Sequence, residues 1–533
     1  MSKKNPASIS IYIYRLFLIA IFSLPYNQNI IFASSHDHEY IYDASELGEQ
    51  FKKELAGKPF LVGVSTSEHQ CSKKCTPEIC DWSRYAQQNN LKQPTDPEYT
   101  LNLWENHKPY ADQEKDKLHI NAKRISIEWA LVQPKGPDSF DKEALQHYAD
   151  MVTYMIEKDI TPMICFHHYT SPCWFADKNG FETINNCPYF ATYASTTYDY
   201  IIKHIIAHPS TYQKWLDLEA NNRGLLLATF NSPEGVAFKG YRQGEGPPSD
   251  PAKQGLYWVT LVLENMMEAH VQAYAAINNA HQNITKNIKS SNPNTQNIII
   301  PKPKIGFLKN MMQFDPAPNL NMVSKAITAF TCAIATKLND TSIFDFFRTG
   351  TFDSVIPFVT APSLYNAKAP KSLDWIGCNN YSNTFMRLFS RVTPDPSDPN
   401  ATDNTTYIIN PDSLYRALST LHEKLAKPLN IPIYVTENGI ATNDSDKKNR
   451  FYKGYLHELL KAIKNGIPVL GYLTWTSGDN YEWPKTKDSN PLQGDNRKYG
   501  LMAPSKDGKT LILKKGAQYF IDYARALTAI NNN

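Results

Sequence analysis

Short apolar runs, rich in β-branched and aromatic residues, alternate with long helix-compatible segments over most of the chain. There are eight such runs, at residues 59–67, 122–129, 161–169, 224–231, 303–310, 373–381, 432–439 and 469–477. This rhythm is typical of repeated βα units around a buried parallel sheet. Eight units close naturally into a barrel. The sequence therefore predicts an α/β fold consisting of a single (β/α)8 barrel, in one domain over residues 36–533.

The segments between the runs predict both helices and loops. Residues 450–466 carry an apolar stripe at helical spacing and end in Asn465-Gly466, a good stop for a helix. Residues 256–280 predict another helix. The stretches 241–255 and 390–407 are rich in Pro, Gly, Asp and Asn, and they predict surface excursions or pocket walls.

Nearly every predicted strand ends in polar or aromatic residues. Examples are Glu68-His69-Gln70, His167-His168-Tyr169 and Asn379-Asn380-Tyr381. A single polar residue at a strand end is more often a loop cap than a ligand. In an eight-stranded barrel, however, these ends converge on one face, where active sites lie. Polar ends on eight strands in succession favour a shared polar pocket.

The first 35 residues have the pattern of a signal peptide. Lys3, Lys4 and Arg15 precede a nine-residue apolar run at 16–24, and the small residues of 33–35 follow. An uncleaved membrane anchor is the alternative, but the apolar run is too short to span a bilayer. Beyond residue 35 no apolar run is long enough to do so. We therefore expect an exported protein (secreted, periplasmic or in a secretory lumen) without a stable membrane span after signal removal.

Composition and charge exclude several classes of function. The chain is 42% hydrophobic and 12% aromatic, as expected of a folded globular protein. Lys and Arg total 55 against 52 acidic residues, and no basic run is interleaved with aromatic residues, so a nucleic-acid partner is not predicted. No nucleotide-binding loop or metal-ligand motif appears, so neither a cofactor nor a metal is predicted. No pattern specifies an oligomeric state.

Seven of the eight cysteines lie in positions that indicate a role. Cys71, Cys75 and Cys80 share one loop, and Cys173 and Cys187 flank another. The spacing of the first three is a poor match to zinc sites, and His69 is the only histidine nearby, so a disulfide that braces the loop is the favoured interpretation. Cys165 and Cys378 lie inside apolar strand-like runs and predict buried packing residues.

Glu437 is the natural candidate for a nucleophile that attacks a sugar. It ends the apolar run 432–436, and the turn-forming Asn438-Gly439 would leave its carboxylate at the mouth of the barrel. Hydrolysis of a glycoside with retention of configuration needs two carboxyl groups about 5 to 5.5 Å apart. If this motif stood alone, a solvated loop glutamate would be the favoured interpretation.

The stretch IPIYVTENG, which contains Glu437, resembles the nucleophile strand of glycoside hydrolase family 1, the β-glucosidase family. The resemblance extends over about residues 58–525. It implies a retaining β-glycosidase (an O-glycosyl hydrolase) that acts on β-linked glycosides or glycans, with Glu437 as nucleophile. The stretch RISIEW resembles the strand that places a cation beside the nucleophile, here Arg124, and GCNNY implies a role for Tyr381.

The same resemblance implies a set of sugar-binding residues. FLVGVSTSEHQ supplies a glutamine, HYTSP a histidine, GCNNY an asparagine, and WTSGDNYEW a stacking tryptophan with a distal Glu-Trp pair. Sugars present apolar C–H faces to aromatic rings and hydroxyl groups to polar side chains, which suits these residue types. For the two tryptophans, core packing is the alternative in isolation. The implied ligands are Gln70, His168 (rather than His167), Asn231, Asn379, Trp475, Glu482 and Trp483.

The stretch LLLATFNSPEGVAF lacks the expected acid. The fourth strand of the family ends Thr-x-Asn-Glu-Pro, where the Glu protonates the departing oxygen; here Ser232 stands at that position. A positioned general acid contributes a factor of about 10² to 10⁴ in rate, and a serine hydroxyl is not acidic near neutral pH.

Three hypotheses follow from this substitution. In the first, the protein is an ordinary β-glycosidase in which Glu234 substitutes as the acid. In the second, it is a retaining enzyme restricted to good leaving groups or to transglycosylation. In the third, it is a pseudo-glycosidase that binds a glycan without cleaving it.

Overall fold

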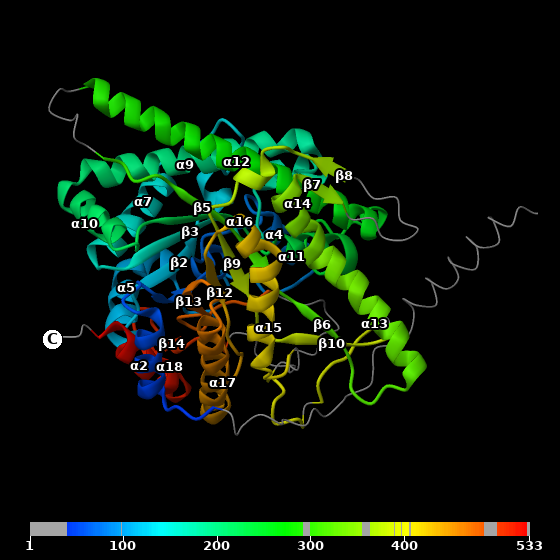
Figure 1. Ribbon diagram of the computed structural model, residues 1–533. Coiled ribbons are helices and arrows are strands. Elements are labelled where there is room, and N and C mark those ends of the chain that lie inside the picture. Colours follow the sequence, from blue (N-terminus) through cyan, green and yellow to red (C-terminus); the bar gives the residue numbers. More distant parts are fainter. Residues whose placement is uncertain are drawn as a thin grey trace, which may run out of the picture.

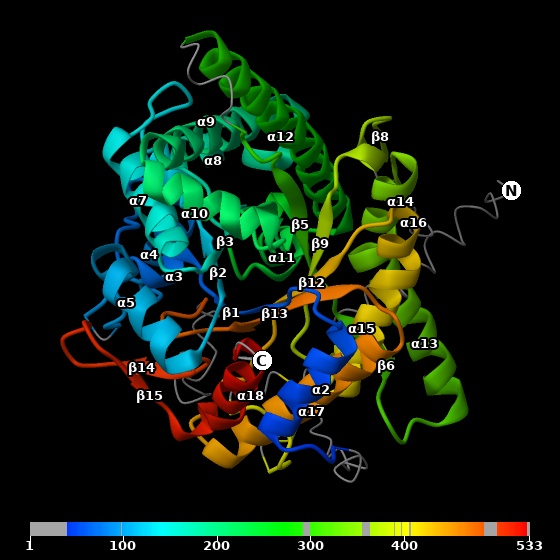
Figure 2. The same cartoon turned by 60° about the vertical axis from the view of Figure 1, so that its left-hand side comes forward.

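The core of the protein is a closed barrel of eight parallel strands with helices around it (Figures 1 and 2). The computed structural model describes residues 40–97, 99–291, 299–353, 363–388, 390–395, 397–403, 407–483 and 498–529. The predicted signal peptide, residues 1–35, lies outside them. The barrel strands are β1 (Leu61–Ser65), β2 (Ala122–Ser126), β3 (Thr161–His167), β4 (Leu226–Asn231), β5 (Lys304–Asn310), β9 (Trp375–Asn379), β12 (Ile433–Glu437) and β13 (Val469–Trp475). Each lies within one of the eight predicted runs, so the predicted barrel fold is confirmed.

The strands are apolar on both faces, which is why they appear in the sequence as continuous apolar runs. The inward-facing layer is formed by Leu61, Ala122, Met163, Cys165, Leu226, Ala228, Leu308, Trp375, Tyr434 and Leu473. Outward-facing residues such as Phe307 and Cys378 belong to the larger core under the helices. At Gly306 a Cβ atom would lie 2.3 Å from the Trp375 indole, so only glycine fits beside this ring.

Helices of varied length cover the outside of the barrel. The longer ones are α2 (Ala44–Leu55), α5 (Leu103–Leu118), α7 (Lys142–Glu157), α9 (Cys187–Ala207), α10 (Pro209–Ala220), α12 (Leu256–Ser291), α13 (Met322–Thr336), α15 (Asp412–Leu421), α17 (Ser445–Lys464) and α18 (Gln518–Thr528). Helices α12 and α17 confirm the two predicted from the sequence. Among the described residues, no helix is long and apolar enough to cross a membrane.

Shorter helices and helical turns lie in the connections between the barrel strands and the longer helices. These are α3 (Glu68–Cys71), α4 (Asp81–Gln88), α6 (Trp129–Val132), α8 (Cys173–Asp177), α11 (Pro233–Phe238), α14 (Ser342–Thr349) and α16 (Lys427–Leu429), with the π-helical turns η3 (Lys239–Gln243), η6 (Lys337–Thr341) and η8 (His422–Ala426) and the 3₁₀ turns η1 (Gly180–Glu182), η2 (Ile184–Asn186), η4 (Pro251–Lys253), η7 (Ala369–Lys371) and η9 (Lys515–Ala517). Three small sheets lie outside the barrel and consist of β6 (Gln313–Pro316) with β10 (Asn383–Arg387) and β11 (Ser390–Arg391), β7 (Thr351–Asp353) with β8 (Ser363–Tyr365), and β14 (Met502–Pro504) with β15 (Leu511–Leu513).

The cysteines differ from expectation. All eight lie in the described part of the chain and all are free, so the predicted loop-bracing disulfide is not formed. Cys71 is buried on α3, whereas Cys75 and Cys80 lie close to His69. Cys165 and Cys378 are fully buried on their strands, as predicted.

Candidate active site

The carboxylate of Glu437 is held by two donors at the carboxyl ends of the barrel strands. Its Oε1 accepts a hydrogen bond from Arg124 Nη2 at 2.5 Å, and its Oε2 accepts one from the Tyr381 hydroxyl at 2.7 Å. Burial, together with the charge of Glu437, raises the pKa of Tyr381 well above its usual value, so the phenol stays protonated and donates. The structure thus brings these three predicted residues together and fixes the orientation of the carboxylate.

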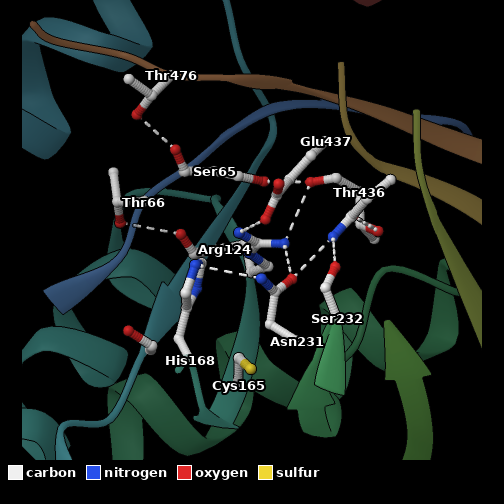
Figure 3. A network of polar contacts seen from close by, with 12 residues as sticks. Ser65, Thr66, Arg124, Cys165, His168, Asn231, Ser232, Thr436, Glu437 and Thr476 are labelled. Carbon is white, nitrogen blue, oxygen red and sulfur yellow. Dashed lines mark hydrogen bonds and ion pairs between the residues drawn. The ribbon is translucent and has the colours of Figure 1, made fainter. Parts of the chain in front are cut away.

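Arg124 connects the Glu437 carboxylate to the neighbouring strands. The guanidinium is fully buried, and its Nη1 donates to Asn231 Oδ1 at 3.1 Å (Figure 3). It also lies 5.7 Å from the centre of the Trp475 ring. A buried cation is costly unless it is paired, and the Glu437 carboxylate supplies the opposite charge.

A chain of amide hydrogen bonds extends from Arg124 across the mouth of the barrel. Asn379 Nδ2 donates to Asn231 Oδ1 at 2.9 Å and to Ser232 Oγ at 3.0 Å. Asn231 Nδ2 in turn donates to His168 Nε2 at 3.1 Å. Burial, with Arg124 nearby, holds the pKa of His168 well below its usual value, so the ring is neutral and can accept. His167 lies outside this chain of bonds and contacts Ser171 instead.

Ser232 occupies the sharp turn between β4 and α11. Its backbone is left-handed, with φ at 46°, and its N–H donates to the Leu308 carbonyl at 2.8 Å. Pro233 then begins α11, where its fixed φ suits the first turn. The Ser232 hydroxyl consequently lies against Asn379, on the same polar network as Glu437 (Figure 3).

Glu234 points away from this network. Its Oε1 accepts hydrogen bonds from Lys309 Nζ at 2.7 Å and from the Asn310 N–H at 2.8 Å. Lys309 also pairs with Asp340 at 2.8 Å. Because Leu308 faces the inside of the barrel, Lys309 lies on the outer side of β5, and the Glu234 carboxylate lies there with it. The structure therefore does not bring Glu234 together with Glu437.

An aromatic wall lines the other side of the mouth. The His168 ring lies 5.7 Å from that of Trp475 and 6.4 Å from that of Trp483. Gln70 Nε2 donates to the Tyr481 carbonyl at 2.9 Å, which fixes the glutamine beside this wall. Glu482 accepts from the Trp483 N–H at 3.2 Å, and its burial raises the pKa of its carboxyl to about 7. Rings and polar groups side by side suit a ligand that is apolar on its faces and hydroxylated at its rim.

Comparison with known proteins identifies the family of the chain. The sequence pattern of glycosyl hydrolase family 1 matches residues 58–527. The chain belongs to this family. It is 22% identical over 433 residues to β-glucosidase A of Thermotoga maritima, a match that covers 76% of this chain and 82% of the relative. It is 23% identical to the galactolipid galactosyltransferase SFR2 of Arabidopsis thaliana over 71% of this chain and 51% of that one.

Solved structures of the family share the fold. The family 1 β-glucosidase of Thermotoga maritima in complex with isofagomine lactam aligns with a TM-score of 0.69 and 19% identity, covering 88% of this chain and 98% of that one. The predicted family is therefore confirmed, and the barrel of this family 1 glycosyl hydrolase is that of its relatives.

Three residues in contact with this candidate site were not predicted. Thr436 Oγ1 donates to Asn379 Oδ1 at 2.7 Å and so directs the amide N–H groups towards Asn231 and Ser232. Tyr169 is buried with its ring 5.3 Å from that of Trp483, and Lys239 is close enough to Glu482 to lower the pKa of that carboxyl. Tyr169 had a signal in the sequence, since it is the aromatic residue directly after His168. Lys239 had none, because it lies beyond the predicted strand and its loop end, in the π-helical turn η3 after α11.

Proposed function

We propose that this family 1 glycosyl hydrolase is a retaining β-glycosidase that uses Glu437 as nucleophile, has no carboxylic acid at position 232, and turns over substrates with good leaving groups. The proposal rests on the contrast between the side chains at the ends of β12 and β4. Arg124 and Tyr381 orient the Glu437 carboxylate, whereas the side chain at the end of β4 is a hydroxyl bonded to Asn379.

The first step would form a glycosyl-enzyme. A Glu437 oxygen attacks the anomeric carbon while the bond from that carbon to the aglycone oxygen breaks, and the electron pair departs with the aglycone. Ser232 cannot protonate that oxygen near neutral pH, so an aglycone that is stable as an anion leaves far faster than an alkoxide. A water oxygen then bonds to the anomeric carbon, the bond to Glu437 breaks and leaves its carboxylate, and the surplus water proton passes to the solvent. Two inversions give net retention.

The position of Glu234 supports this proposal over an ordinary β-glycosidase with a substitute acid. Its carboxylate is a partner in a buried group with Lys309 and Asp340. Moving it to the barrel mouth would leave the Lys309 ammonium with one fewer partner in an apolar setting, which costs several kcal/mol, of the order of 3 to 5.

Transglycosylation is a second candidate for the same site. Without a carboxylate at position 232 to deprotonate water, the glycosyl-enzyme has a longer lifetime in which a sugar or lipid hydroxyl can bind and attack. The similarity to a relative named a galactosyltransferase supports this candidate.

Kinetics with paired substrates test the proposal. We expect the protein to cleave a 2,4-dinitrophenyl β-glucoside or β-galactoside and to leave the matching alkyl glycoside almost untouched. A 2-deoxy-2-fluoro glycoside with the same leaving group should label Glu437, as located by peptide mass spectrometry. Azide, an anion that attacks without base assistance, should accelerate turnover and yield a β-glycosyl azide.

Placing a carboxyl group at position 232 is the most direct test of the proposal. Ser232→Glu should raise kcat/KM for the alkyl glycoside by about 10² to 10⁴ and abolish the azide effect, whereas the uncharged control Ser232→Gln should do neither. Rapid cleavage of alkyl glycosides by the natural chain, lost in Glu234→Gln, would instead assign the acid to Glu234. Sugar binding without labelling or turnover would leave a glycan-binding module.

A further inference from the structure

A buried His-Cys-Cys cluster lies behind the aromatic wall of the sugar site. The candidate ligand atoms of His69, Cys75 and Cys80 all lie within 4.8 Å of one another, and Cys80 Sγ is 3.6 Å from His69 Nδ1. All three side chains are at most 1% exposed. His69 belongs to α3, Cys75 to the following loop, and Cys80 is the N-cap of α4, so one short stretch of chain folds back on itself to gather them.

These separations suit a tetrahedral zinc ion. Zinc binds thiolate sulfur at about 2.3 Å and imidazole nitrogen at about 2.0 to 2.1 Å, which places a sulfur and a nitrogen ligand about 3.6 Å apart. The contact between Cys80 and His69 has that length. His69 Nε2 has no hydrogen-bond partner among the described residues. The polar contact of the ring is therefore the one between its Nδ1 and the Cys80 sulfur.

The charge of such a site would also balance. Histidine binds zinc through the lone pair of its neutral imidazole and adds no charge to the site. Zinc binding would displace one proton from each thiol, and two thiolates then neutralise the divalent ion. A neutral complex suits the surroundings, which consist mainly of Trp82, Tyr85, Tyr99, Ala130, Tyr481 and Trp483.

A carboxylate stands beside the cluster. Glu128 lies near Cys75, and its carboxylate accepts hydrogen bonds from the Thr170 hydroxyl at 2.7 Å and from the Ala130 N–H at 3.3 Å. Glu128 is thus placed to orient Cys75 from outside the coordination sphere, the usual role of a carboxylate next to a metal ligand.

We propose that His69, Cys75 and Cys80 form a structural zinc site that braces the aromatic wall of the sugar pocket. The His69 ring lies flat against Trp483, with centroids 5.2 Å apart and an angle of 5° between the planes. Trp82, two residues after Cys80, also packs against Trp483, with 4.5 Å between the ring centroids. A metal ion that fixes His69 and Cys80 would therefore fix the surface on which Trp483 rests.

Metal analysis of the full chain tests this proposal. Protein made in zinc-supplemented medium should carry one zinc per chain after gel filtration. Cys75→Ser and Cys80→Ser should each lose most of it, while the matched control Cys173→Ser should retain it. Cys173 is also a buried free thiol, and the residue before it, Pro172, forms a β-bridge with Cys80. The Cys173 sulfur, however, donates to the Pro77 carbonyl and is not part of the cluster. Cobalt(II) in place of zinc should give the visible and thiolate charge-transfer bands of a tetrahedral site.

A second measurement on the natural chain covers variants that fail to fold. Alkylation of the native protein should modify Cys75 and Cys80 only after a chelator has removed the metal, with Cys173 unaffected. A drop in unfolding temperature on chelation, reversed by added zinc, should accompany this change. Metal-free protein in which peptide mapping finds a Cys75–Cys80 disulfide would overturn the proposal, as would zinc retained equally by all variants.

Discussion

At the scale of single residues, we expect Glu482 to couple sugar binding to pH. Burial raises the pKa of its carboxyl to about 7, with Glu437 adding to the rise and Lys239 and the Trp483 N–H opposing it. An ionised carboxylate accepts hydrogen bonds from sugar hydroxyls more strongly than a protonated one, by about 1 to 2 kcal/mol. We therefore expect the affinity for a neutral sugar to rise roughly fivefold to thirtyfold as the pH increases through about 7, and then to level off.

Titration calorimetry or inhibition by a neutral monosaccharide from pH 5 to 9 would measure this effect. Glu482→Gln carries no titrating group and should bind with a flat profile at a similar level to the protonated natural chain. The same pH dependence in both proteins would assign the effect to another group.

The sequence predicted Glu437 because it ends a strand-like run, and the strand ends of a barrel converge. Arg124 and Tyr381 were predicted from the family resemblance. It could not predict where Glu234 points. That residue lies two positions beyond β4, past a left-handed Ser232 and a proline, and the turn into α11 directs its carboxylate to Lys309. The gathering of His69, Cys75 and Cys80 was likewise hidden, since an irregular loop brings them together.

At the scale of elements, a buried ion group connects three segments around β5. Lys309 on β5 pairs with Glu234 on α11 at 2.7 Å and with Asp340 on η6 at 2.8 Å, and all three side chains are almost fully buried. Replacing Lys309 would leave the buried carboxylates of Glu234 and Asp340 without their cationic partner. Lys309→Met should therefore lower the free energy of unfolding by about 3 to 5 kcal/mol, measured by urea denaturation.

Lys304 on the same strand is the matched control. It pairs with Glu219 at 2.8 Å, but its side chain is 40% exposed, so Lys304→Met should cost about 1 kcal/mol or less. Equal losses in the two variants would contradict a special role for the buried group.

The element scale also shows what hydrophobic pattern can and cannot predict. The eight barrel strands are buried on both faces and stand out as apolar runs. The small sheet of β6, β10 and β11 was not predicted, because β6 is half-exposed along its length and β11 has only two residues. Strands β6 and β10 pair across a long separation in sequence, which local pattern does not reveal.

At the scale of the whole molecule, the two ends of the described chain meet where the barrel closes. Strands β1 and β13 pair in parallel, with Ser65 opposite Trp475, and helices α2 and α18 lie side by side nearby (Figure 2). At Gly48 on α2 a Cβ atom would lie 2.6 Å from the Ala526 Cβ on α18, so the helices touch closely.

Loss of α18 should therefore prevent folding of the whole barrel, not merely shorten the chain at its surface. Phe520, Ile521 and Tyr523 are buried, and the Tyr523 ring packs edge-on against Phe51 of α2 at 5.1 Å. Burying three such side chains contributes about 5 to 9 kcal/mol, a large share of the roughly 5 to 15 kcal/mol that stabilises a typical protein. A chain cut after Ala517 should be insoluble or lack a cooperative unfolding transition by calorimetry, whereas a cut after Ala529 should leave the transition unchanged. A soluble chain ending at Ala517 with the natural unfolding temperature would show that the barrel closes without this helix.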